Sequence, residues 1–166
     1  MQPLKLIEAK EQDIPVIAEL AQVVWQQYYP SIISQDQIDY MLEKMYNADS
    51  LKEQMQIKQH RFFLLYLAEE AIGFLSTHEE AKDEWFLNKF YINQHKACKG
   101  LGSEALQMII KQLQVKKISL TVNRQNYKSI NFYFKNGFVI ERVADFDIGN
   151  GYVMNDFVMV WNALNH

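Results

Sequence analysis

Two glycines separated by one residue, in Lys99-Gly100-Leu101-Gly102-Ser103, are the sequence feature that most constrains the fold of this chain. The segment lies between a strand-like run, Phe86 to Ile92, and a helix-like run, Ser103 to Leu113. Glycines at the start of a helix let main-chain N–H groups approach an anion closely, and the helix dipole favours negative charge there. The segment therefore predicts a phosphate-binding loop, although glycines also occur in ordinary turns.

A second segment, Val122 to Phe138, begins about 20 residues after the glycine loop. It follows the pattern N-x-x-A/S-x-x-F/L-Y-x-K-x-G-F through Asn126, Ser129, Phe132, Tyr133, Lys135, Gly137 and Phe138. Together the loop and this pattern resemble the GNAT superfamily of acyl-CoA-dependent N-acetyltransferases. The loop departs from the family's Q/R-x-x-G-x-G/A motif at two positions. Ala97 stands where Gln or Arg is usual, and Cys98 stands where glycine is frequent.

Composition excludes several other classes of protein. A chain of 166 residues suits one domain, and we expect a single domain over residues 1–166. The net charge of −3 and the mixing of Lys with Glu predict no nucleic-acid or membrane partner. No apolar run reaches the roughly 18 residues of a membrane helix, and no signal-peptide pattern occurs, so a cytoplasmic location is the default expectation. One cysteine and four scattered histidines predict no metal site.

Hydrophobic periodicity predicts an alternation of strands and helices along the chain. Strands are expected over Pro3–Glu8, Arg61–Leu67, Ala71–Ser76, Glu84–Ile92, Lys117–Val122, Phe138–Asp147 and Tyr152–Trp161. Helices are expected from Asp13, as the cap, to Pro30, after the cap Ser34, from Ser103 to Leu113 and from Asn126 to Asn136, with a weaker signal over Ser50–Ile57. The order β-α-α-β-β-β-α-β-α-β-β is that of the GNAT fold. It is an α+β fold with a mixed, mostly antiparallel sheet and helices on both faces.

The resemblance implies where acetyl-CoA binds. The strands Glu84–Ile92 and Lys117–Val122 are expected to diverge, and the pantetheine arm to lie between them. The main chain of Phe90, Tyr91 and Ile92 would pair with its amides, because an open strand edge offers free N–H and C=O groups. The pyrophosphate would lie on the glycine loop, and the expected contacts are Ala97, Cys98, Lys99, Gly100, Leu101, Gly102 and Ser103.

Two residues of the second motif have both a functional and a structural interpretation. By resemblance Asn126 holds the cofactor arm, and the same side chain could cap the helix that follows it. By resemblance Ser129 lies near the pantetheine or the phosphate, and a small residue there could also permit close packing. Both residues are expected cofactor contacts.

Tyr133 is the expected general acid, as tyrosine at this position is in the family, and it also belongs to the expected cofactor contacts. A phenol of pKa about 10 can protonate the departing thiolate. The alternative is a core aromatic beside Ile130 and Phe134. For the base, the family uses a carboxylate on the splayed strand or a chain of waters. Glu84 and the Glu79-Glu80 pair lie nearest the start of that strand. Glu84 is the expected carboxylate, ahead of His78 and His95.

Aromatic and acidic residues predict a pocket for a cationic amine. The aromatic candidates are Trp25, Tyr28, Tyr29 and Tyr152, and the acidic ones are Asp145, Asp147 and Asp156. The chain is loosely similar to bacterial polyamine acetyltransferases of the family, so a polyamine is an expected acceptor, beside a peptide or protein amine. The alternative function is an acyl-CoA-binding sensor or interaction module. A homodimer through the Tyr152–Trp161 strand is also expected.

Overall fold

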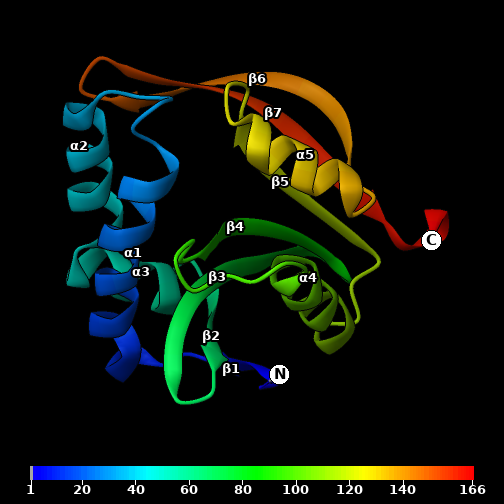
Figure 1. The fold of residues 1–166 in the computed structure, drawn as a ribbon. Coiled ribbons are helices and arrows are strands. Elements are labelled where there is room, and N and C mark those ends of the chain that lie inside the picture. Colours follow the sequence, from blue (N-terminus) through cyan, green and yellow to red (C-terminus); the bar gives the residue numbers. More distant parts are fainter. Residues whose placement is uncertain (1) are drawn as a thin grey trace.

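The protein, described by a computed structural model over residues 2–166, is built on one seven-stranded sheet (Figure 1). Its strands are β1 (Leu4–Glu8), β2 (Arg61–Leu67), β3 (Glu70–Ala81), β4 (Glu84–Ile92), β5 (Lys117–Asn123), β6 (Val139–Gly149) and β7 (Tyr152–Asn162). They lie in the order β1-β2-β3-β4-β5-β7-β6. Only β4 and β5 pair in parallel, and every other neighbouring pair is antiparallel. The mixed, mostly antiparallel sheet predicted from the sequence is confirmed.

Helices cover both faces of the sheet, as predicted. They are α1 (Ile14–Tyr28), α2 (Gln35–Tyr46), α3 (Ala48–Gln56), α4 (Leu101–Gln112) and α5 (Tyr127–Lys135), with 3-10 turns at Glu11–Asp13 and Ala163–Asn165. The first three helices pack on one face, where Phe62, Leu64 and Phe74 are buried. Helices α4 and α5 pack on the other face over Phe63, Leu75 and the centre of β5. Strand β2 is continuously apolar from Phe62 to Leu65 because this part is buried on both faces of the sheet.

Side-chain caps begin several of the helices. Ser34 Oγ accepts a hydrogen bond from Gln37 N at 3.2 Å, and Asn47 Oδ1 accepts one from Ser50 N at 2.8 Å. The expected cap Asp13 does not bond to α1. Its carboxylate instead accepts from Lys10 N at 2.8 Å and closes the short turn before the helix. The weak helical signal over Ser50–Ile57 belongs to α3, so the chain has one helix more than the expected order.

Strands β4 and β5 pair over only part of their length. Their register runs from Glu84 opposite Lys117 to Leu87 opposite Leu120 and then stops. Directly beyond this point, Asn88 is an extra residue in β4, because Leu87 and Lys89 face consecutive residues of β3. A bulge of this kind bends a strand and increases its twist. The remainder of β4 therefore diverges from β5, and its edge on that side is open. The divergence of these two strands that the family resemblance implies is present.

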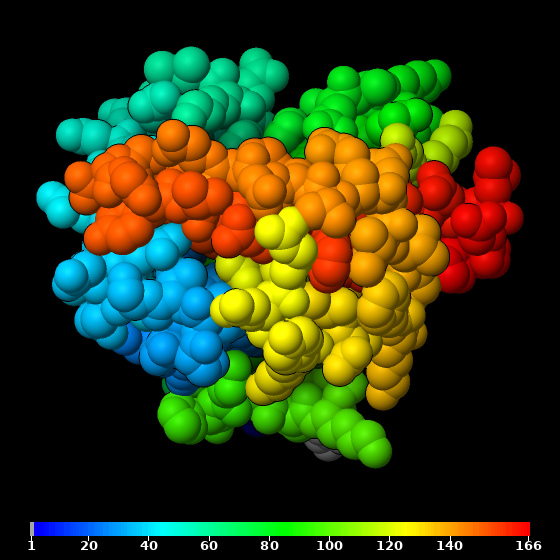
Figure 2. All heavy atoms as spheres, turned by 90° about the horizontal axis from the view of Figure 1, so that it is seen from above, coloured from blue at the N-terminus to red at the C-terminus, as the bar shows by residue number. Residues whose placement is uncertain are grey.

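The hairpin of β6 and β7 spans the opening between the two halves of the sheet. Asn150 and Gly151 form its turn with φ of 54° and 76°, as expected of an Asn-Gly turn. Near the tip, Ile148 O accepts hydrogen bonds from Tyr40 Oη at 3.0 Å and Lys44 Nζ at 2.6 Å. Figure 2 shows the hairpin, in orange, lying against the blue-to-cyan helical segment. These bonds tie the β6 end of the hairpin to α2.

No helix within residues 2–166 has the length and apolar character needed to cross a membrane. Over the same residues, no cluster of three or more His, Cys, Asp or Glu side chains has the arrangement of a metal site.

Candidate active site

Two cavities meet where β4 and β5 separate. The loop-side cavity, of about 360 Å³, lies under the glycine loop and is lined by residues that include Ile92, Gly102 and Phe132. The helix-side cavity, of about 270 Å³, lies toward α1 and α2 and is lined by residues that include Trp25 and Asp156. Phe90, Ser129 and Tyr133 line both. A molecule bound in one cavity would therefore meet a molecule bound in the other at these residues.

The glycine loop shapes the loop-side cavity through its backbone. Gly100 caps α4 with φ of 92°, a conformation that a side chain would strain, while the space around it is open. At Gly102 a Cβ would lie only 3.1 Å from Phe132 Cε2, so glycine permits close packing of α4 on α5. The helix start directs main-chain N–H groups without intrahelical partners toward an anion.

The other expected loop residues divide into two groups. Ala97, Cys98, Gly100, Gly102 and Ser103 line the loop-side cavity, whereas Lys99 and Leu101 do not. Lys99 is exposed and Leu101 is buried in the core. Two cations that were not predicted as site residues, Lys128 and Lys135, also line the cavity. Their spacing of seven residues on one predicted helix was the available signal, because such residues share a face.

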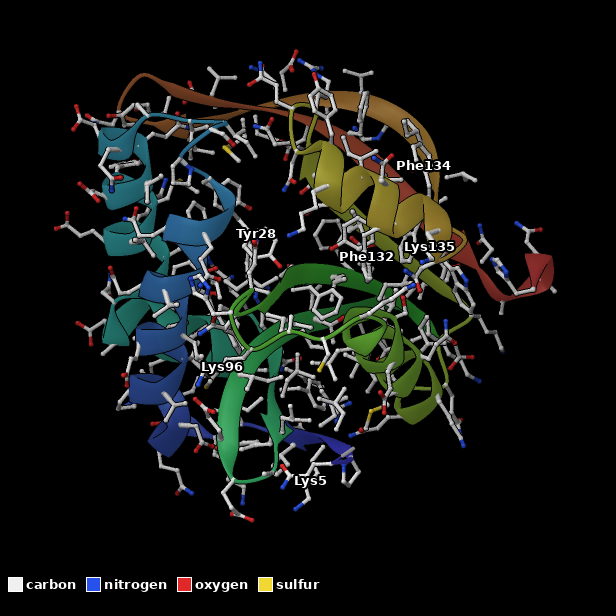
Figure 3. The ribbon with its side chains drawn as sticks, viewed as in Figure 1. Lys5, Tyr28, Lys96, Phe132, Phe134 and Lys135 are labelled. Carbon is white, nitrogen blue, oxygen red and sulfur yellow. The ribbon has the colours of Figure 1, made fainter. Side chains whose placement is uncertain are left out.

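The open part of β4 is held by α1. Tyr28 Oη donates to Ile92 O at 3.3 Å, and Gln27 Oε1 accepts from Gln94 N at 2.8 Å. Tyr28 and Phe132 both line the loop-side cavity, and Figure 3 shows them approaching the central space from α1 and α5, while Phe134 points outward. The expected backbone contacts thus lie at the cavities, although Ile92 O already accepts one hydrogen bond within the chain.

Asn126 caps a helix and also lines a cavity, so its location is compatible with both roles considered for it. Its Oδ1 accepts from Ser129 N at 3.2 Å and caps α5, which confirms the structural interpretation. The same buried residue lines the helix-side cavity, and Ser129 lines both cavities. The cap leaves the amide nitrogen of Asn126 free to serve as a donor.

Tyr133 combines core packing with access to both cavities. Its ring contacts Phe132 and Phe138 at centroid distances of 5.2 and 5.3 Å, and only 8% of the residue is exposed. Burial raises the pKa of the phenol well above its usual value, with smaller contributions from Tyr29 and Tyr28. The hydroxyl therefore stays protonated and can act as a hydrogen-bond or proton donor.

The four expected acceptor aromatics do not gather in one pocket. Trp25 and Tyr29 line the helix-side cavity, where Tyr29 Oη lies 2.7 Å from Tyr91 Oη. Burial raises the pKa of Tyr29 to about 12. Tyr28 lines the loop-side cavity instead, and Tyr152 lines neither cavity but packs on Tyr40 at 5.3 Å. The expectation for Tyr152 therefore lacks a geometric basis.

Of the three acids considered, only Asp156 lines the helix-side cavity. It is 5% exposed, and its Oδ1 finds no hydrogen-bond partner within residues 2–166. Burial raises the pKa of this carboxyl to about 6, against the opposing effect of a hydrogen bond from Thr121. Asp145 instead pairs with Arg124 at 2.8 Å, and Asp147 accepts from Gly149 N.

The structure does not bring Glu84 to the cavities. It begins β4 at the end where that strand still pairs with β5, and its carboxylate lies 3.8 Å from Lys117 Nζ at the surface. Leu87, the last paired position, lies three residue steps or about 10 Å further along the strand. The assignment of Glu84 as base is corrected on this ground. His78 and His95 also line neither cavity.

Lys89 is a buried residue of the helix-side cavity that sequence reasoning missed. Its Nζ donates to Gln54 Oε1 at 2.7 Å and lies 5.6 Å from the ring centroids of both Tyr46 and Phe62. Burial, with help from the charge of Lys58, lowers the pKa of Lys89 to about 7. A regular strand alternation would not predict this position, because the bulge at Asn88 changes the face that Lys89 occupies.

Comparison with known proteins agrees with this geometry. The model of the Acetyltransferase (GNAT) family matches residues 18–138. A spermidine N(1)-acetyltransferase of Thermoplasma acidophilum is 27% identical over an alignment of 137 residues, and the match covers 78% of this chain and 84% of that protein. The chain belongs to the GNAT acetyltransferase family, and its enzyme class is N-acetyltransferase.

Solved structures show the same fold. The PaiA N-acetyltransferase of Thermoplasma acidophilum in complex with coenzyme A superposes with a TM-score of 0.77 at 23% identity, covering 96% of this chain and 99% of that one. An acetyltransferase of Thermus thermophilus superposes with a TM-score of 0.69 at 19% identity, covering 98% and 99% of the two chains. The GNAT architecture thus extends over nearly the whole chain.

Proposed function

We propose that the protein transfers an acetyl group from acetyl-CoA to a primary amine by direct attack in a ternary complex. The observation that carries this proposal is the meeting of the two cavities at Tyr133, in the opening between β4 and β5. One cavity would hold the acetyl donor and the other would hold the acceptor. Proximity of the two reactants is itself a large part of the catalysis in such an arrangement.

The loop-side cavity fits acetyl-CoA. The backbone of Gly100, Gly102 and Ser103 offers a helix start for the pyrophosphate, and the Lys128 and Lys135 ammonium groups complement further negative charge. The open edge at Phe90–Ile92 offers main-chain groups to the pantetheine arm. Acetyl-CoA supplies an activated acyl thioester when it is bound.

Tyr133 is proposed as the general acid. Its phenol stands at the junction of the cavities and remains protonated at neutral pH because burial raises its pKa. A donor at this position stabilises the negative charge that develops on the leaving sulfur. A protein that only senses acyl-CoA would gain nothing from this hydroxyl.

A small cationic amine, such as a polyamine, is the proposed acceptor. The support comes from the helix-side cavity, whose aromatic and methionine walls surround the carboxylate of Asp156, and from the resemblance to a spermidine N(1)-acetyltransferase. Trp25 and Tyr29 would contact the alkyl part of the amine. A peptide amine, a homodimer and a cytoplasmic location stay predictions.

The test combines calorimetric titration with a thiol-release assay. We expect acetyl-CoA to bind with micromolar affinity, and release of free CoA thiol to require an amine, with spermidine and spermine ahead of amino acids. Binding of acetyl-CoA without transfer to any amine or peptide of the panel would favour the sensor. Absence of both heat and thermal stabilisation at millimolar acetyl-CoA would contradict both functions.

A further inference from the structure

The strand register of β7 directs the side chain of Asp156 into the helix-side cavity. Asp156 in β7 pairs with Asn123 in β5, and its neighbours Phe157 and Met159 pack with the core under α5. Because side chains alternate along a strand, Asp156 projects from the opposite side of β7. Thr121, on β5, lines the cavity with it. The only carboxylate in the cavity lining thus comes from a wall that faces α1 and α2.

Asp156 is exceptional among the acids of the chain because it is buried without a full set of partners. Its Oδ1 has no hydrogen-bond partner within residues 2–166, and a buried unpaired acceptor is costly unless a ligand satisfies it. The charged and titratable groups around it are Arg124 beyond β5, Asp145 on β6, Tyr29 on α1, Lys89 and Tyr91 on β4, and Tyr133 on α5. None of these donates to that oxygen.

We infer that Asp156 is the general base of the reaction, and this inference rests on the proposed acetyl transfer. The acceptor ammonium gives one proton to Asp156 Oδ1, and its N–H bond breaks. The freed electron pair forms the N–C bond to the thioester carbonyl carbon. The C–S bond then breaks, and the thiolate takes the proton of the Tyr133 hydroxyl. The acylated nitrogen still holds one proton more than a neutral amide, and it passes that proton to the Tyr133 phenolate. Water removes the proton from Asp156, so both groups are restored and one proton is released overall.

Other groups in the cavity are less suited to accept this proton. The phenols of Tyr29 and Tyr133 are protonated at neutral pH, since burial raises the pKa of both. Lys89 is already engaged with Gln54. The pKa of Asp156, about 6, leaves its carboxylate ionised at pH 7 yet more basic than an exposed aspartate.

The experiment compares wild type with Asp156→Asn by kcat/KM for spermidine between pH 6 and 10. We expect a loss of about 100-fold at pH 7, in the range of general-base catalysis. The variant can use only amine that is already deprotonated in solution, so its rate should rise about tenfold per pH unit toward the amine pKa of about 10. The ratio of wild-type to variant kcat/KM should therefore fall as pH rises. A ratio of wild-type to variant kcat/KM that is the same at all pH values would overturn the inference.

Two variants separate this role from a structural one. Asp156→Glu keeps a carboxylate and should recover part of the rate with the wild-type shape of the pH profile. Asp145→Asn removes a neighbouring exposed charge and should leave the rate within about twofold at pH 8, because Asp145 acts on Asp156 only through a screened Coulomb interaction. Equal rates for wild type and Asp156→Asn at pH 7 would overturn the inference.

Folding of the variant can be checked independently. The raised pKa of Asp156 means that its ionised form destabilises the folded state above about pH 6. Asp156→Asn should therefore melt no lower than wild type at pH 8, which would exclude misfolding as the cause of the lost rate. If wild type acetylates no amine, the proposed function fails and this inference fails with it. If wild type is active and Asp156→Asn is equally active, only this inference fails.

Discussion

The loop-side and helix-side cavities are built from different parts of the chain. The loop-side cavity depends on one short loop, one helix start and one strand edge, so backbone geometry defines most of its surface. The helix-side cavity depends on side chains from α1, α2, β4, β5 and the β6–β7 hairpin. Under the proposed function, the donor site would be encoded locally in the sequence, whereas the acceptor site would depend on elements that are far apart in the chain.

The two cavities should therefore respond differently to substitution. Changes in the loop-side cavity should alter the affinity for acetyl-CoA and leave the chemistry intact. Changes at the junction or in the helix-side cavity should alter catalysis, stability or their pH dependence. The following predictions test this contrast, from the largest expected effect to the smallest.

Replacing Tyr133 by Phe should lower kcat about 100-fold or more, because the leaving sulfur loses its proton donor. The affinity for acetyl-CoA should change little, since the ring and its contacts with Phe132 and Phe138 remain. Steady-state kinetics and calorimetry measure the two effects separately. Phe134→Leu, on the outward side of α5, is the control and should retain wild-type kcat. Full activity of Tyr133→Phe would refute the assignment of the acid.

Replacing Lys89 by Met should change the pH dependence of stability. The pKa of Lys89 is about 7 in the folded protein and 10.5 in its ordinary state, so the unfolded chain binds more protons between these values. The free energy of unfolding of wild type should therefore rise with pH from about 7 to 10, by at most about 1.4 kcal/mol per unit. Urea denaturation at a series of pH values measures this slope.

Lys89→Met should lose that rise and should be more stable than wild type at pH 7, offset in part by the unpaired Gln54 Oε1. Lys5→Met, at an exposed position of β1, should keep the wild-type slope. A variant at Lys89 with an unchanged slope would show that another group titrates in this window.

Replacing Gly100 by Ala should weaken acetyl-CoA binding about tenfold, which corresponds to about 1.4 kcal/mol. The space around Gly100 is open, so the effect arises from its φ of 92° alone. The matched control is Gly151→Ala, which has φ of 76° and open space in the β6–β7 turn. It should lose similar stability but bind acetyl-CoA as wild type does. Equal affinities for the two variants would contradict a backbone-defined loop-side cavity.

Replacing Ala97 by Gln should strengthen acetyl-CoA binding by at most about fivefold, the value of one net hydrogen bond of about 1 kcal/mol. Ala97 lines the loop-side cavity at the position where the family usually has Gln or Arg. Lys99→Gln, at an exposed position outside the cavity lining, should change the affinity by less than about twofold. A larger effect at Lys99 than at Ala97 would mean that the loop adopts another conformation when acetyl-CoA binds.

Much of the fold could be predicted because its signals are local. Ser34 and Asn126 cap helices through side chains that bond three residues onward, and Asn150-Gly151 forms its turn through its own backbone. The Asp13 cap failed because Lys10 N competes for the same carboxylate. Whether a second donor competes for the cap depends on the path of the chain before the helix. The periodicity of the sequence does not indicate that path.

The sequence by itself determined the GNAT fold, the glycine loop and the position of Tyr133 on α5, because each depends on spacing within a short segment. Tertiary structure decided which side chains share a cavity. Glu84 lies on the splayed strand but at its paired end, whereas Asp156 reaches the cavity from β7. The bulge at Asn88 and the docking of the β6–β7 hairpin on α2 determine which side chains reach the cavity. Both features set strand register and direction across residues far apart in the chain.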